Sequence, residues 1–163
     1  MAEQNETTSP ASPKPGKDRW VKRGFVIALL VAAAVVAFFQ LRGPKLGWPS
    51  DLDAALAQAQ AGNRKVVVFV RSFPLSTEAK DLISGPLSRP ENRQALEKGN
   101  FILVEIGLDR DADWAKRYGV AKSPTMLVIS PDAQSFHKAE GFIGEVEFRA
   151  QFLTAPLNEK VKR

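Results

Sequence analysis

The chain of 163 residues contains no cysteine and only one histidine. Without cysteine it can form no disulfide, no thiolate nucleophile, no dithiol redox pair and no iron–sulfur cluster held by thiolates. A single histidine excludes the usual protein zinc sites and leaves one candidate for imidazole chemistry. The composition therefore gives no support to an enzymatic activity, a cofactor or a bound metal.

Positive charge is present, but it is not concentrated in one place. The net charge is +5, of which residues 1–23 contribute +2 and residues 42–163 contribute +3. Domains that bind nucleic acid usually carry a concentrated basic face, and the sequence contains no RNA- or DNA-binding motif. We therefore expect no nucleic-acid partner.

Charge is missing altogether from residues 24–41, which read GFVIALLVAAAVVAFFQL. A helix of about 18 residues rises about 27 Å, close to the thickness of the hydrocarbon core of a bilayer. A buried core helix would need a large domain around it, and this run follows a polar tail. A cleavable signal peptide would need small residues after the apolar core. Residues 38–42 read FFQLR, which makes a poor cleavage site. The run therefore predicts one transmembrane helix that is an uncleaved signal anchor, with the lipid bilayer as its partner.

Basic residues flank this apolar run unequally. Two basic residues follow it, and five precede it: Lys14, Lys17, Arg19, Lys22 and Arg23. The positive-inside rule places the N-terminus in the cytoplasm and the C-terminal domain outside it. In a bacterium this would be the inner membrane, with the domain facing the periplasm. Residues 1–23, rich in Ser, Thr and Pro, are expected to form a disordered cytoplasmic leader.

The remainder of the sequence predicts a linker, one compact domain and a short tail. The linker is residues 42–49, with two Gly and two Pro, the domain is residues 50–157, and the basic C-terminal tail is residues 158–163. Ser50 is expected to cap the first helix of the domain, and Ser88 to begin another.

Four apolar runs in the domain are typical of strands, and helices are predicted before, between and after them. The strands are expected at residues 65–71, 101–108, 125–130 and 135–140. Strands separated by helices are expected to pair in parallel, and the last two strands to form an antiparallel hairpin. The expected fold class is α/β, with a mixed four-stranded sheet and helices on both faces.

Three local strings, together with this order of elements, resemble the thioredoxin superfamily. They are KVVVFVRSFPLSTEAKDLI at residues 65–83, AKRYGVAKSPTMLVISPDAQ at residues 115–134, and the Glu140-Gly141 step that precedes the last helix. The opening helix and the helix at residues 88–99 resemble the extracytoplasmic variant of this fold, which includes domains of bacterial disulfide-interchange proteins. The resemblance covers roughly residues 48–155 and implies a thioredoxin-like fold.

The resemblance also implies a functional face, from which the cysteines are missing. The family's Trp-Cys-x-x-Cys motif falls on residues 73–77, so the two redox positions are Pro74 and Thr77; a slip of one residue would place Ser76 at the second. Pro124 matches the family proline that precedes a strand with a cis bond, or it only shapes its loop. The implied peptide-binding face is Phe73, Pro74, Thr77, Ser123 and Pro124.

Two further groups of residues have ordinary structural interpretations. Asp109, Asp111 and Asp113 alternate like the start of a calcium-binding loop, but Trp114 and Val120 stand where an EF-hand needs Gly and Glu. His137 has no nucleophile motif near it in the sequence, so we expect a structural histidine rather than a general base.

These observations predict a membrane-anchored, redox-inactive thioredoxin-like domain that acts as an extracytoplasmic interaction module for a protein or an extended peptide. The alternative is a structural or assembly subunit of a membrane complex, in which the transmembrane span makes the key contacts. An enzyme is the weakest interpretation, because no nucleophile, base and orienting group come together in the sequence.

Overall fold

The computed structural model describes residues 18–42 and 46–161, with side chains in the first helix described for residues 24–37. Residues 1–17 of the expected leader, residues 43–45 of the expected linker and residues 162–163 of the expected tail lie outside this description. The chain divides into two units, Met1–Gln40 and Leu41–Arg163.

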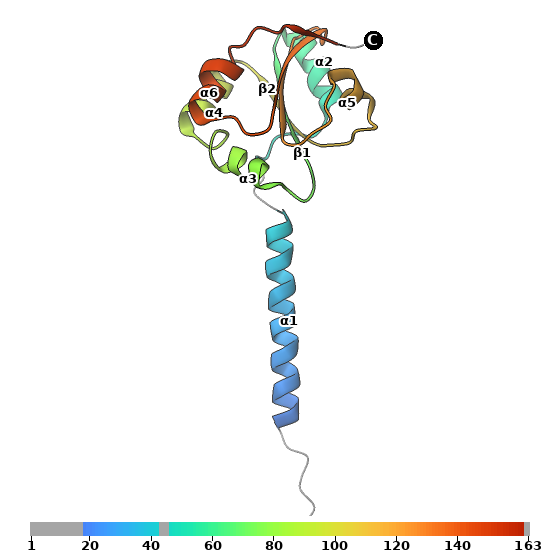
Figure 1. Cartoon of the computed structure of the whole chain (residues 1–163), viewed down its shortest axis with the longest axis vertical. Coiled ribbons are helices and arrows are strands. Elements are labelled where there is room, and N and C mark those ends of the chain that lie inside the picture. The colour runs from blue at the N-terminus through green and yellow to red at the C-terminus, as the bar shows by residue number, and fades with distance from the viewer. Residues whose placement is uncertain (1–17, 43–45, 162–163) are drawn as a thin grey trace, which may run out of the picture. The chain divides into compact units, whose positions relative to one another are not determined.

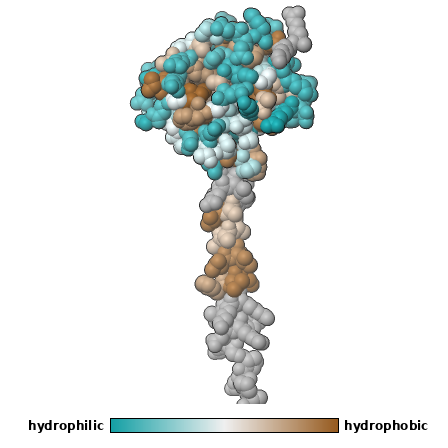
Figure 2. Space-filling view, in the orientation of Figure 1, coloured by the Kyte–Doolittle hydropathy of each residue, from teal (hydrophilic) through white to brown (hydrophobic). Residues whose placement is uncertain are grey.

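One long helix, α1, at Asp18–Arg42, begins in the first unit and ends two residues after its boundary. Every side chain described in it is exposed, and the large apolar ones give it the brown surface of Figure 2. Among the residues that the structure describes, no helix combines the length and the apolar character that crossing a membrane requires.

The second unit is built on a five-stranded sheet with the order β2-β1-β3-β4-β5 (Figure 1). Its strands are β1 Val66–Arg71, β2 Ile102–Gly107, β3 Thr125–Ile129, β4 Ser135–Glu140 and β5 Glu159–Lys160. The side chains of the run VVVFV are fully buried on both faces of the sheet. This burial is what an unbroken apolar run predicts for a central strand.

The sheet is mixed, as predicted, but the direction of one strand differs from the expectation. β1 and β2 are parallel and β3 and β4 form an antiparallel hairpin, whereas β3 runs antiparallel to β1. The connection between β2 and β3, residues 108–124, carries the six-residue helix α5, Asp113–Tyr118. Because β2 is parallel to β1 and β3 is antiparallel to it, the chain re-enters the sheet at the end where β2 left it.

The expected sheet has four strands, and the structure adds a fifth from the predicted tail. Glu159 and Lys160 pair antiparallel with Phe136 and Ser135 of β4. Two charged residues show no alternation of apolar and polar side chains, so the sequence does not predict a strand there. Their pairing with β4 depends on the position of the chain after the preceding helix.

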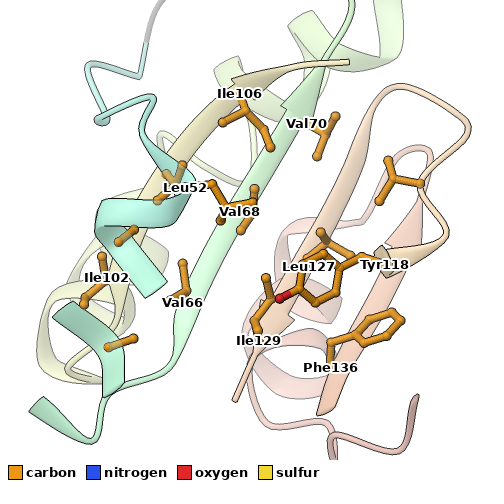
Figure 3. Packing of buried hydrophobic residues seen from close by; sticks show 14 of the residues in the cluster. Leu52, Val66, Val68, Val70, Ile102, Ile106, Tyr118, Leu127, Ile129 and Phe136 are labelled. Atoms are coloured by element: carbon orange, nitrogen blue, oxygen red, sulfur yellow. The ribbon is translucent and has the colours of Figure 1, made fainter. Parts of the chain in front are cut away.

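Helices cover both faces of the sheet, as predicted (Figure 1). One face carries α2, Leu52–Gly62, and α5; the core beneath them is built on Val66, Val68, Val70 and Leu127 (Figure 3). The other face carries α3 Thr77–Ser84, α4 Pro90–Lys98, α6 Glu145–Glu147 and the π-helical turn η1 Phe148–Phe152. Alternate residues of β1 enter the two cores, as the period of a strand requires.

Two predicted helix caps differ from the structure. Asp51, not Ser50, caps α2, and its carboxylate accepts a hydrogen bond from the N–H of Ala54 at 2.9 Å. Helix α4 begins at Pro90 after Arg89, while the hydroxyl of Ser88 donates to the carbonyl of Ile83. In each case a second polar residue beside the predicted cap takes the position, which sequence spacing alone does not resolve.

Candidate functional site

The candidate face lies where β1 ends and β3 begins. Val70 of β1 pairs with Thr125 of β3, so the loop after β1 and the loop before β3 leave the sheet side by side. This placement depends on the antiparallel pairing of β3 with β1. It brings residues 72–74 next to residues 123–124.

A hydrogen bond joins the two loops directly. The backbone N–H of Ser72 donates to the hydroxyl oxygen of Ser123 at 2.6 Å. Each loop also contains a cis peptide bond, at Phe73-Pro74 and at Ser123-Pro124. Four of the five predicted site residues therefore belong to one connected pair of loops.

The five predicted residues differ in how much surface they present. Phe73 is 72% exposed, and Pro74 and Thr77 are also exposed. Ser123 is half-buried and Pro124 is buried. Phe73 is therefore the main apolar contact that this face offers, while Pro124 lies beneath the surface.

Thr77 is the first residue of α3, and its neighbour Ser76 caps that helix. The hydroxyl of Ser76 accepts a hydrogen bond from the N–H of Ala79 at 3.2 Å, and the hydroxyl of Ser72 donates to the carbonyl of Pro74 at 3.3 Å. These hydroxyls thus bond to the backbone of their own loop or helix, which defines the local conformation.

A third loop, at Gly141 and Phe142, belongs to the same face and was not included in the sequence prediction. The N–H of Gly141 donates to the carbonyl of Pro124 at 2.8 Å. Gly141 has a φ of +84°, which favours glycine, and a Cβ there would lie 3.8 Å from a carboxylate oxygen of Glu78. Phe142 is 53% exposed. The Glu140-Gly141 step was the available sequence signal, but it does not reveal the contact with Pro124.

Charged residues support the loop before β3 from the side of β4. The ammonium of Lys138 lies 3.1 Å from the carboxylate of Glu140 and donates to the carbonyl of Gly119 at 2.8 Å. Lys122 lies 3.7 Å from the same carboxylate. The hydrogen bond from Lys138 and the charges of both lysines hold the pKa of Glu140 below its ordinary value, against a smaller opposing effect of burial.

A buried ion pair lies at the end of β1, immediately before the candidate face. The guanidinium Nε of Arg71 contacts a carboxylate oxygen of Glu105 on β2, without the alignment of a hydrogen bond. Glu105 is only 6% exposed and Arg71 is 24% exposed. The pair joins the end of β1 to β2. Removing either partner would leave the other charge in a poorly hydrated position.

The other residues singled out from the sequence lie in structural settings. The ring of His137 on β4 packs against Phe152, with 5.5 Å between the ring centroids. Asp109 accepts a hydrogen bond from the N–H of Asp111 at 3.0 Å. Within the part of the chain that the structure describes, no three His, Asp or Glu side chains are grouped to hold a metal ion.

The chain is similar to solved structures of thioredoxin-like proteins. A thioredoxin from Thermus thermophilus is 27% identical over 62% of this chain and 78% of that chain, with a TM-score of 0.45. The C-terminal domain of Neisseria meningitidis DsbD is 20% identical over 63% of this chain and 93% of that domain, with a TM-score of 0.46. A disulphide isomerase from Xylella fastidiosa is 17% identical over 64% of this chain and 86% of that chain, with a TM-score of 0.43. No protein-family model and no curated protein matches this chain.

The fold itself is a thioredoxin-like α/β fold. It is seen in this chain's own strand order, in the parallel pair β1 and β2, in the antiparallel hairpin β3 and β4, and in helices on both faces.

Proposed function

We propose that this chain is a redox-inactive thioredoxin-like domain on a membrane anchor, and that it binds an extracytoplasmic protein or an extended peptide. The binding face comprises Phe73, Pro74, Thr77, Ser123 and Pro124. One observation carries the proposal: an exposed Phe73 stands on a loop that a hydrogen bond from Ser72 to Ser123 holds against the start of β3.

The proposal of redox inactivity follows from the composition. Thiol–disulfide exchange needs an attacking thiolate and a sulfur that leaves, and the chain has no cysteine. The positions that match the redox cysteines hold Pro74 and Thr77. We therefore propose that the face binds without catalysing a reaction.

The backbone of Ser123 supports an extended peptide as the ligand. Its N–H and C=O make no hydrogen bond with any residue that the structure describes, although the next residues enter β3. A peptide beside this position can add strand-like hydrogen bonds, as in β-augmentation. Phe73 and Phe142 then offer apolar contacts for its side chains.

The anchor and its orientation are part of the proposal. The uncharged run at residues 24–41 lies within helix α1, and the large apolar side chains described in α1 are exposed. A bilayer would cover that apolar surface. The excess of basic residues before the run supports a cytoplasmic N-terminus and an extracytoplasmic domain.

The same exposed surface of α1 supports a second candidate function, that of a structural subunit in a membrane complex. Contacts of the span with other helices would then matter more than the face at Phe73. The two candidates differ in which part of the chain a partner needs.

Site-specific photo-crosslinking of the full chain in its own membrane separates these candidates. A photo-reactive phenylalanine analogue at position 73 is expected to crosslink to an extracytoplasmic polypeptide, whereas the same analogue at the exposed Gln94 is not. Ser123→Ala is expected to reduce the crosslink at position 73. If the partner is still bound by Phe73→Ala and Ser123→Ala, but is lost when residues 24–41 are exchanged for an unrelated span, the structural subunit is the correct function.

A reporter fused after Arg163 tests the orientation separately. We expect activity from a reporter that works only outside the cytoplasm. Activity of a cytoplasmic reporter would contradict the orientation without affecting the proposal for the binding face.

A further inference from the structure

The outer edge of β4 is only partly covered by β5. Strand β5 pairs with Ser135 and Phe136, and in the described part of the chain no strand lies beside the rest of β4 on that side. The edge of a sheet presents backbone N–H and C=O groups with which another chain can pair. The end of β4 that leads to Gly141 is therefore open to a further strand.

The direction of the backbone groups in this part of β4 follows from its pairing with β3. The N–H of Gly141, the residue after β4, donates to the carbonyl of Pro124 at 2.8 Å, so Gly141 turns its backbone toward β3. In an antiparallel pair, successive residues turn their N–H and C=O groups alternately toward the partner strand and away from it. Lys138 and Glu140 therefore turn theirs to the outer edge.

Three of these outward groups lack a partner among the described residues. The N–H of Lys138 donates to a carboxylate oxygen of Glu159 at 3.2 Å. The C=O of Lys138, and both the N–H and the C=O of Glu140, make no hydrogen bond with any residue that the structure describes. One donor between two acceptors along a strand edge matches the backbone of an extended chain. The edge thus favours a polypeptide over a compact ligand.

A groove lies beside this edge, on the face of the sheet that carries η1. Its volume is 440 Å³, within the range of ligand sites. Its apolar lining consists of Ala139, Phe142, Ile143, Phe152 and Ala155. The side chains of a strand alternate between the two faces of a sheet, so every second side chain of a peptide added to β4 would face this groove.

The charge of the groove is negative. Glu140 and Glu147 line it, and no lysine or arginine does. Glu140 is already neighboured by the ammonium groups of Lys138 and Lys122. Glu147 is exposed, and within the described residues its carboxylate accepts the N–H of Gly144 but pairs with no cation. The groove therefore complements a ligand that carries a basic group beside an apolar one.

We propose that the uncovered edge of β4 and this groove bind an extended polypeptide segment as an added strand. The segment places an apolar side chain against Ile143 and Phe152, and a basic side chain two positions along the segment beside Glu147. The proposal needs none of the five residues of the peptide face at Phe73, so either proposal can fail without the other.

The test is an NMR titration of the isotope-labelled full chain, in detergent micelles, with the peptide acetyl-Thr-Leu-Thr-Lys-Thr-amide. The peptide carries an apolar and a basic residue two positions apart. We expect saturable shifts of the Lys138 and Glu140 amides. At saturation, hydrogen exchange of the Glu140 N–H should slow by about tenfold or more, because the peptide then shields it from water. The N–H of Ala139, which is turned toward β3, should be protected with or without the peptide.

Two N-methylated forms of the same peptide are the matched controls, and they leave the protein unchanged. One is methylated at the backbone nitrogens of Leu and Lys, and the other at those of the three Thr. Only one alternating set of amides faces β4 in an added strand. We therefore expect one form to lose binding and the other to retain it.

Variants of the chain test the groove and its independence from the peptide face. Glu147→Gln should weaken binding about threefold, the size of an exposed ion pair, and Gln still suits the N-terminal turn of α6. Asp81→Asn, an exposed carboxylate that does not line the groove, and Phe73→Ala should both leave binding of this peptide unchanged.

Several outcomes would overturn the proposal. Equal binding of the two methylated forms, or an unprotected Glu140 amide at saturation, would exclude strand addition. Loss of binding in Phe73→Ala would place the peptide on the other face. Protection of the Glu140 amide that rises with the concentration of the chain alone would show that a second copy, not a partner segment, occupies the edge.

Discussion

The N–H of Ser72 donates a hydrogen bond of 2.6 Å to the hydroxyl of Ser123, across 51 positions of sequence. The bond joins the loop that carries Phe73 to the loop that leads into β3. It gives the candidate face a fixed geometry that involves no disulfide, and several measurable consequences follow from it and from its surroundings.

Ser123→Ala should destabilise the chain by about 1–2 kcal/mol, because it leaves the partly buried N–H of Ser72 without its acceptor. Urea denaturation measures the change. Ser84→Ala is the matched control, since that exposed hydroxyl bonds only to a carbonyl of its own helix, and its effect should stay within about 0.5 kcal/mol. Equal effects of the two substitutions would show that the bond between the loops contributes nothing to stability.

Asn92 offers a second test of packing, beneath α6. Its buried amide donates to the carbonyl of Pro86 at 2.9 Å and to that of Glu145 at 3.0 Å. Asn92→Ala leaves both carbonyls without this donor and should cost about 2–3 kcal/mol. Gln94→Ala on the exposed side of the same helix should change the free energy of unfolding by less than about 0.5 kcal/mol.

The ion pairs of Glu140 predict a pH dependence in the acid range. The pKa of Glu140 is lowered in the folded chain, so its contribution is present above the ordinary value of 4.5 and is lost as the pH falls through the folded value. At neutral pH, Glu140→Gln should cost about 0.5 kcal/mol, the size of a partly exposed pair. The difference in unfolding free energy between this variant and the parent chain should shrink to zero on acidification; a constant difference would contradict the assignment.

Tyr118 predicts a pH dependence in the alkaline range. Burial raises its pKa above the ordinary value of 10.0, so the stability is retained below pH 10.0 and falls as the pH rises further. It is the only tyrosine of the chain, so the tyrosinate absorbance reports it alone. The folded chain should titrate at higher pH than the chain in urea, and Tyr118→Phe should remove the alkaline loss of stability. Identical titrations of the folded and unfolded chain would show that the phenol is not buried.

In the view of Figure 2, a patch of hydrophobic surface lies on the side of the domain that carries α4 and α6. Phe142, in the loop before α6, is 53% exposed, and Val146 on α6 is 72% exposed. Phe142 follows Gly141, which bonds to Pro124, so part of this surface is continuous in the chain with the candidate face. Phe142→Ala should therefore weaken crosslinking at position 73, and Val146→Ala serves as the control. Unchanged crosslinking in Phe142→Ala would limit the binding face to the two loops that the sequence predicted.

The strands and the two-sided helical covering could be predicted from the sequence because burial leaves a local pattern. The run VVVFV indicates a strand covered on both faces, and it is the central strand β1. The direction of β3 could not be predicted in the same way. It depends on the end of the sheet to which the chain returns after α5, and apolar periodicity does not specify that end.

The candidate site was also predictable only in part. Phe73 and Ser123 came from the resemblance of two strings, whereas the contact of Gly141 with Pro124 and the pairing of Arg71 with Glu105 had no local signal. The acceptor of a hydrogen bond or the partner of a charge can lie anywhere in the chain, so spacing along the sequence does not identify it.

The sequence by itself determined what chemistry is closed to this protein. A chain without cysteine cannot exchange disulfides, whatever its fold, because that reaction requires sulfur. Only the tertiary structure decided which residues meet. It placed Ser72 against Ser123, and Arg71 against Glu105. The physical reason is that composition limits the available functional groups, while hydrogen bonds and ion pairs depend on distances that only the folded chain defines.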